Sequence, residues 1–184
     1  SRFTAQPQFY GRFSGGYDSN GDILRSEGLI GSNGKNYDLG IFGSWSQGND
    51  YIDGKGFTIP SGFLRGSFGT SLGLKITAHQ QLKLSATRNL ARDAIFATLP
   101  MDLREDDTWL LNASHTIDIG KRNLQSWSTS IYGTFVDHLM DNKLKNLDPR
   151  MVNARTDAKT YSYGGRTEGT WNPDMGLLYT GIDL

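Results

Sequence analysis

The sequence predicts an all-β fold, specifically a segment of an antiparallel transmembrane β-barrel with about nine strands, short periplasmic turns and long outer loops. Three observations predict it: apolar and polar residues alternate with a period of two, the alternating runs are long, and short connections follow long ones. The clearest run covers residues 63–77, where the two sets are Leu64, Phe68, Leu72, Leu74 and Ile76 against Arg65, Ser67, Ser71, Lys75 and Thr77. One face of this strand is apolar and the other is polar.

The remaining strands follow from the same alternation. It recurs at residues 9–17, 24–30, 37–46, 82–85, 111–119, 127–135 and 163–171, and residues 176–184 form a last, poorly phased strand. With their ends included, most strands are about 10 to 15 residues long, against about 5 or 6 in soluble proteins. A strand that crosses a bilayer at a tilt needs this extra length.

The connections between the strands alternate in length. Short turns are expected at 32–35, 78–80, 120–123 and 172–176, and long segments at 49–62, 96–107 and 141–159; only 18–21 is short where a long one is due. Asn33-Gly34 has the chemistry of a type I′ hairpin turn. A soluble sandwich has no reason to keep short and long connections at opposite ends. Aromatic residues near the strand ends suit interfacial girdles: they are Tyr17, Tyr37, Trp109, Trp127, Tyr161 and Trp171.

Composition excludes several classes of function. Lysine plus arginine equals aspartate plus glutamate, at 19 each, so no net field draws the chain to nucleic acid. There is no cysteine, which removes disulfides, thiol nucleophiles and cysteine metal clusters. No run of 18 apolar residues and no secretory signal is present, which excludes a helical span. We find no catalytic motif and expect a protein that is not an enzyme and requires no cofactor.

Two groups of residues could bind a ligand. The phase of strand 127–135 places His138 and Met140 on the polar side, and an imidazole beside a thioether suits copper, although such residues are more often plain wall residues. Met101 and Met151 lie in long loops that open on the same side. An acidic run could hold a hard cation such as calcium, or could be a solvated loop or strand boundary: its members are Asp102, Glu105, Asp106 and Asp107.

Charged pairs two residues apart share the polar face of a strand. Arg25 with Glu27 and Arg166 with Glu168 are such pairs. We expect them to face the barrel lumen and to form ion pairs there.

Several stretches resemble the barrel of TonB-dependent outer-membrane receptors, and most closely their copper-receptor branch. The most specific are residues 99–107, Leu-Pro-Met-Asp-Leu-Arg-Glu-Asp-Asp, and residues 136–142, Val-Asp-His-Leu-Met-Asp-Asn. The resemblance implies a barrel of about 22 strands in the bacterial outer membrane, closed by a plug domain. It also implies uptake of a scarce metal or metal chelate, copper or an iron complex, with energy supplied through TonB. In that branch a His-x-Met pair lies at the substrate site, which maps onto His138 and Met140.

We expect residues 1–184 to form one partial barrel domain without the plug, the TonB-binding segment and the remaining strands. Its expected partners are outer-membrane lipid, TonB, the plug and a metal or metal-chelate substrate. Two alternatives remain open at this point. One is a small closed barrel with a structural or adhesive role, and the other is a soluble β-sandwich that binds carbohydrate.

Overall fold

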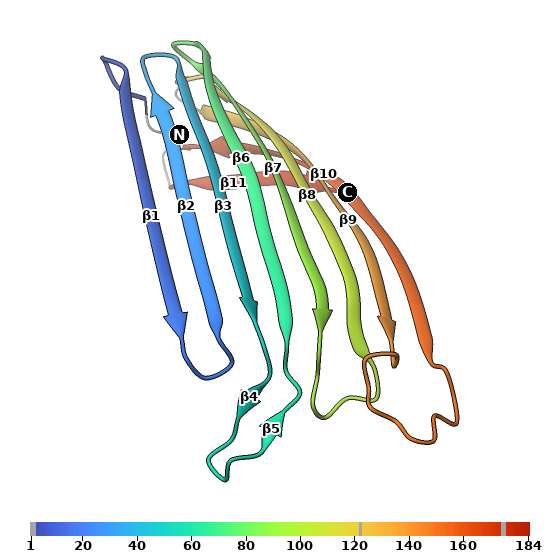
Figure 1. The fold of residues 1–184 in the computed structure, drawn as a ribbon. Coiled ribbons are helices and arrows are strands. Elements are labelled where there is room, and N and C mark those ends of the chain that lie inside the picture. Colours follow the sequence, from blue (N-terminus) through green and yellow to red (C-terminus); the bar gives the residue numbers. More distant parts are fainter. Residues whose placement is uncertain (1–2, 122, 174–175) are drawn as a thin grey trace.

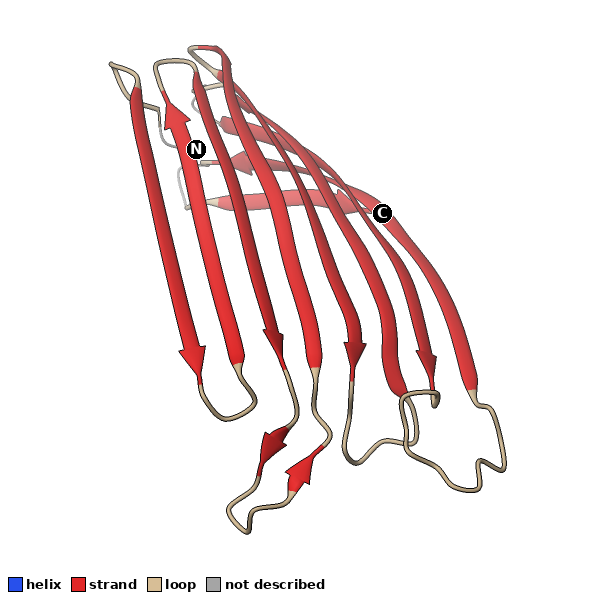
Figure 2. Cartoon of the chain, in the orientation of Figure 1, coloured by secondary structure: helices blue, strands red, loops and turns tan. Residues whose placement is uncertain are grey.

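A single antiparallel sheet makes up most of the molecule. The computed structural model describes residues 3–121, 123–173 and 176–184. The nine long strands run as a meander, each paired with the next along the chain (Figures 1 and 2). They are β1 (Gln8–Asp18), β2 (Ile23–Asn33), β3 (Tyr37–Gly48), β6 (Phe63–Thr77), β7 (Gln80–Ala94), β8 (Asp102–Asp118), β9 (Leu124–Asp141), β10 (Arg155–Trp171) and β11 (Leu178–Asp183). Among the described residues, no helix has the length and apolar character needed to cross a membrane.

The connections separate by length between the two ends of the strands. Those that follow β3, β7 and β9 are long and lie at one end, and the turns after β2 and β6 are short and lie at the other (Figure 1). The connection after β1 lies at the same end as the long loops but is short. This exception was expected from the sequence. Two of the expected short turns, 120–123 and 172–176, fall partly outside the described residues.

Two details of the elements differ from the sequence-based prediction. β8 begins at Asp102 and β10 at Arg155, both inside segments expected to be loops, because both residues find a cross-strand partner in Asp141 on β9. The first long loop contains a small hairpin of β4 (Tyr51–Ile52) and β5 (Thr58–Ile59). The Asp50 carboxylate closes its base by accepting hydrogen bonds from two backbone amides, those of residues 61 and 62.

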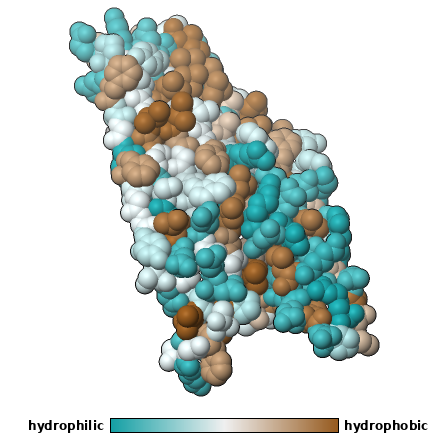
Figure 3. All heavy atoms as spheres, in the orientation of Figure 1, coloured by the Kyte–Doolittle hydropathy of each residue, from teal (hydrophilic) through white to brown (hydrophobic). Residues whose placement is uncertain are grey.

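The two faces of the sheet differ in character, as the alternation predicts. We call the face that carries Leu72, Leu84 and Ile131 the apolar face; cross-strand pairing places them in one row. Ile131 is 63% exposed and Phe68, nearby on the same face, is 45% exposed. In Figure 3 hydrophobic side chains gather toward the turn end, and polar ones over the lower right, where β7 to β10 approach the long loops.

Almost no apolar side chain is buried inside the molecule. Among the described residues only Ala94 and Leu103 count as buried hydrophobic residues. A soluble domain of this length buries most of its apolar surface, so an apolar face left open in this way requires a lipid environment or another covering. The described chain has a single large sheet and no second layer, which contradicts the β-sandwich alternative.

The sheet is open. β1 and β11 stand at its two edges and do not pair with each other. This arrangement contradicts the small closed barrel, which would join its first and last strands.

Candidate functional site

The polar face gathers charged side chains near the ends of the strands that lead to the long loops. Register aligns one row across five strands, from Arg25 on β2 through Ser46 and Arg65 to Ala91 and Asp106. The same row continues to His138 on β9. Residues from distant parts of the sequence thus share one edge of the polar face.

Asp106 and His138 form a direct contact. His138 Nδ1 lies 2.9 Å from Asp106 Oδ2, and Thr108 donates its hydroxyl to the other carboxylate oxygen at 2.9 Å. Both side chains are partly exposed, at 33% for His138 and 24% for Asp106. When the neutral imidazole donates Nδ1–H to the carboxylate, the lone pair lies on Nε2, which is the arrangement of metal-binding histidines in proteins.

Met140 lies on the same face as His138. The pairs Ala158↔His138 and Thr156↔Met140 continue without interruption along β9 and β10, so the two side chains point to one side, about 7 Å apart along the strand. The other two methionines come from the loops at this end: Met101 directly precedes β8, and Met151 is 84% exposed in the β9–β10 connection.

The acidic run does not converge on one point. Glu105 and Asp107 lie on the apolar-face side of β8 and both pair with Arg92, at 3.2 and 2.7 Å. Asp106 points the other way, to His138. Asp102 is fully buried and pairs with Lys145 at 2.6 Å. Within residues 3–121, 123–173 and 176–184, no group of three or more histidine and acidic side chains has the geometry of a metal site.

Two ion pairs between residues two apart on one strand were expected, Arg25 with Glu27 and Arg166 with Glu168. Only the second is formed. Arg166 pairs with Glu168, as expected. Glu27 instead pairs with Arg12 across the β1–β2 ladder, at 3.3 Å. The register explains the exchange, because Arg12 stands opposite Leu29 and therefore reaches Glu27 diagonally. Arg25 is left without that partner.

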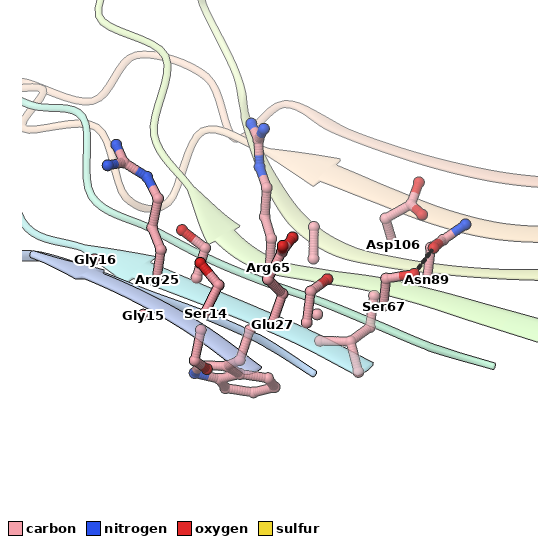
Figure 4. A pocket seen from close by; sticks show the side chains of 16 residues that line it. Ser14, Gly15, Gly16, Arg25, Glu27, Arg65, Ser67, Asn89 and Asp106 are labelled. Carbon is pink, nitrogen blue, oxygen red and sulfur yellow. Dashed lines mark hydrogen bonds between the residues drawn. The ribbon is translucent and has the colours of Figure 1, made fainter. Parts of the chain in front are cut away.

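A hollow of about 690 Å³ lies on the polar face between these residues. Arg25 and Arg65 stand up from β2 and β6 on the same side of the sheet, together with Asp106 (Figure 4). Ser67 donates a hydrogen bond to Asn89 at 2.7 Å along the same wall. The hollow therefore combines two cationic groups, Arg25 and Arg65, with the carboxylates of Glu27 and Asp106 and with neutral hydrogen-bonding groups.

The sequence-based prediction named His138 and Asp106 but did not connect them, and it did not single out Arg65. Alternation places Arg65 and His138 on the polar face, whereas Asp106 fell in a segment expected to be a loop. The missing information is the register between strands, which depends on turn lengths that alternation does not give.

Comparison with known proteins supports the fold. No family model and no curated protein matches the sequence. Comparison of structures places the chain in the class of large antiparallel barrels, of which it forms a stretch of wall. One matching structure is described as "Copper transporter OprC", with a TM-score of 0.86 and 24% sequence identity. The match covers 100% of this chain and 29% of that chain, so residues 1–184 span less than a third of the protein they match. The prediction of a nine-stranded barrel segment is confirmed.

Proposed function

We propose that this chain is part of the barrel wall of a bacterial outer-membrane receptor that takes up a metal ion or metal chelate, copper or an iron complex. TonB supplies the energy in the intact protein, and a plug domain and outer-membrane lipid are its partners. The observation that carries the proposal is the structural likeness of the whole chain to a copper transporter. A transporter binds and releases its cargo without a chemical step, which agrees with a sequence that has no catalytic motif.

The exposed apolar face supports the membrane part of the proposal. Rows of aliphatic and aromatic side chains lie open along strands of up to 18 residues, which suffices to span the hydrocarbon layer at a tilt. The opposite face carries serine, threonine, asparagine and charged residues, which suit a water-filled interior.

The metal part rests on His138 and Met140. An imidazole held by a carboxylate, with a thioether two residues further along the same face, offers one borderline and one soft ligand, a combination that suits copper better than a hard cation. Met101 and Met151 are placed in the adjoining loops, from which they could complete the coordination during uptake.

The test is copper uptake by cells that express the full-length protein with both His138→Ala and Met140→Ala. We expect uptake at limiting copper to fall by about tenfold or more, since two ligands are lost. His79→Ala is the matched control, because His79 lies in the short turn between β6 and β7 at the other end of the sheet. Unchanged uptake in the double variant would remove these residues from the substrate path.

A further inference from the structure

Two arginines on the polar face lack anionic partners. Among the arginines that the structure describes, Arg25 and Arg65 alone have no ion pair and no hydrogen bond; Arg65 only lies over the ring of Phe63, at 5.5 Å. The other described arginines bind carboxylates or backbone carbonyls: they are Arg12, Arg88, Arg92, Arg104, Arg150, Arg155 and Arg166. The chain therefore neutralises its arginines elsewhere and leaves these two open.

Their position favours access from the side of the long loops. Arg25 is the third residue of β2 and Arg65 the third of β6, both counted from that end. Ser46 separates them in the register, so their backbones are about 10 Å apart. Both line the hollow and project from the same side of the sheet (Figure 4).

We propose that this hollow binds a ligand with two or more carboxylate groups, either free or as the shell of a metal chelate. Each guanidinium can hold one carboxylate through two parallel N–H···O bonds, and the spacing of the two arginines suits a di- or tricarboxylate of small size. The Ser46 hydroxyl and the Asn89 amide nitrogen on the same wall can donate to the remaining oxygens, and the hydrogen bond that Ser67 donates to Asn89 Oδ1 orients that amide.

The charge of the hollow also bears on the form of the cargo. Glu27 and Asp106 also line the hollow, but Glu27 pairs with Arg12 and Asp106 contacts His138, so the two guanidinium groups are the charges left without a partner there. They repel a bare cation that approaches past them, whereas an anionic complex is attracted. His138 lies in the same row, three strands beyond Arg65. A metal ion bound near His138 could therefore keep the carboxylate groups of its chelator directed toward the two arginines. This step rests on the proposed transport function; the carboxylate site itself does not.

The experiment is a calorimetric titration of the full-length protein, purified in detergent, with citrate in a metal-free buffer. We expect saturable binding that weakens by about tenfold for Arg25→Gln or Arg65→Gln, and by about a hundredfold for the double variant. Arg25→Lys with Arg65→Lys keeps the charge and should bind with intermediate affinity, because an ammonium group cannot make the two parallel bonds.

The matched control is Lys75→Gln with Lys83→Gln. It removes two positive charges from the same face at neighbouring positions of β6 and β7 near the turn end, outside the hollow. Citrate binding should be unchanged in this variant.

Two results would overturn the proposal: no citrate binding by the unaltered protein, or equal binding by the double glutamine variant and the unaltered protein. A loss of binding in the lysine control as large as in the arginine variant would also overturn it, since the effect would then be one of general charge. None of these results concerns His138 and Met140, whose copper-uptake test can succeed or fail separately.

Discussion

At the scale of single residues, the contact between His138 and Asp106 distinguishes this site from an ordinary polar wall. A histidine on a strand is free to rotate about its side-chain bonds, and a ligand must then bear the entropic cost of fixing it. The hydrogen bond of 2.9 Å to Asp106, which is itself held by Thr108, fixes the ring before a ligand arrives. In the proposed metal site, this contact would leave Nε2 available to the ligand.

This arrangement predicts the effect of Asp106→Asn. The variant keeps the size of the side chain but replaces the carboxylate that orients the imidazole by a neutral amide, so copper affinity should fall by about 10- to 100-fold. Affinity is measured by competitive titration of the purified protein with Cu(II). Asp118→Asn, a change on the same strand and face but near the turn end, should leave it unchanged; an equal affinity of the Asp106 variant and the unaltered protein would show that the contact plays no part in binding.

Sequence reasoning found the face of His138 but not its neighbours, and it left Asp106 in a segment expected to be a loop. The alternation around 127–135 assigns His138 to the polar side without knowledge of any other strand. That Asp106 stands opposite His138 depends on the register of β8 against β9, which continues unbroken from Asp118↔Ser126 to Glu105↔Leu139. Alternation does not give this register, so the pairing is known only from the structure.

At the scale of elements, alternation predicted the strands well because each of them has two different environments. The prediction from alternation failed in segments whose conformation depends on particular hydrogen bonds and ion pairs and not on two different faces. The hairpin of β4 and β5 is held by carboxylates that accept backbone hydrogen bonds, with Asp53 receiving those of Lys55 and Phe57. The buried pair of Asp102 and Lys145 joins the first residue of β8 to the loop after β9, two segments far apart in sequence.

The two faces of β6 should respond in opposite ways to the same substitution. Leu72→Arg places a guanidinium in the central row of the apolar face, where contact with lipid costs about 2–4 kcal/mol. Ser71→Arg places it on the polar face and should cost far less. The measurement is the free energy of unfolding of each variant in lipid bilayers. Equal losses for the two variants would mean that the faces do not differ in environment.

At the scale of the whole molecule, the sheet is a surface without a core. One layer of nine strands exposes apolar side chains on one face and polar side chains on the other, and its two edge strands are unpaired. In the proposed receptor these features have a common explanation: lipid covers the apolar face, the plug and water fill the polar side, and further strands continue the edges.

The most direct test of the account is the sidedness of the strands in a membrane. The chain has no cysteine of its own, so single cysteines can be introduced at each of residues 67–72 of β6 and 109–114 of β8 and labelled with a nitroxide in reconstituted bilayers. Collision with oxygen, which dissolves in lipid, should peak at even positions on β6 and at odd positions on β8, following the register of the structure. Collision with a water-soluble nickel chelate should show the reverse. Loss of this alternation, or access of the chelate to positions 68 and 72, would contradict the assignment of the apolar face to lipid.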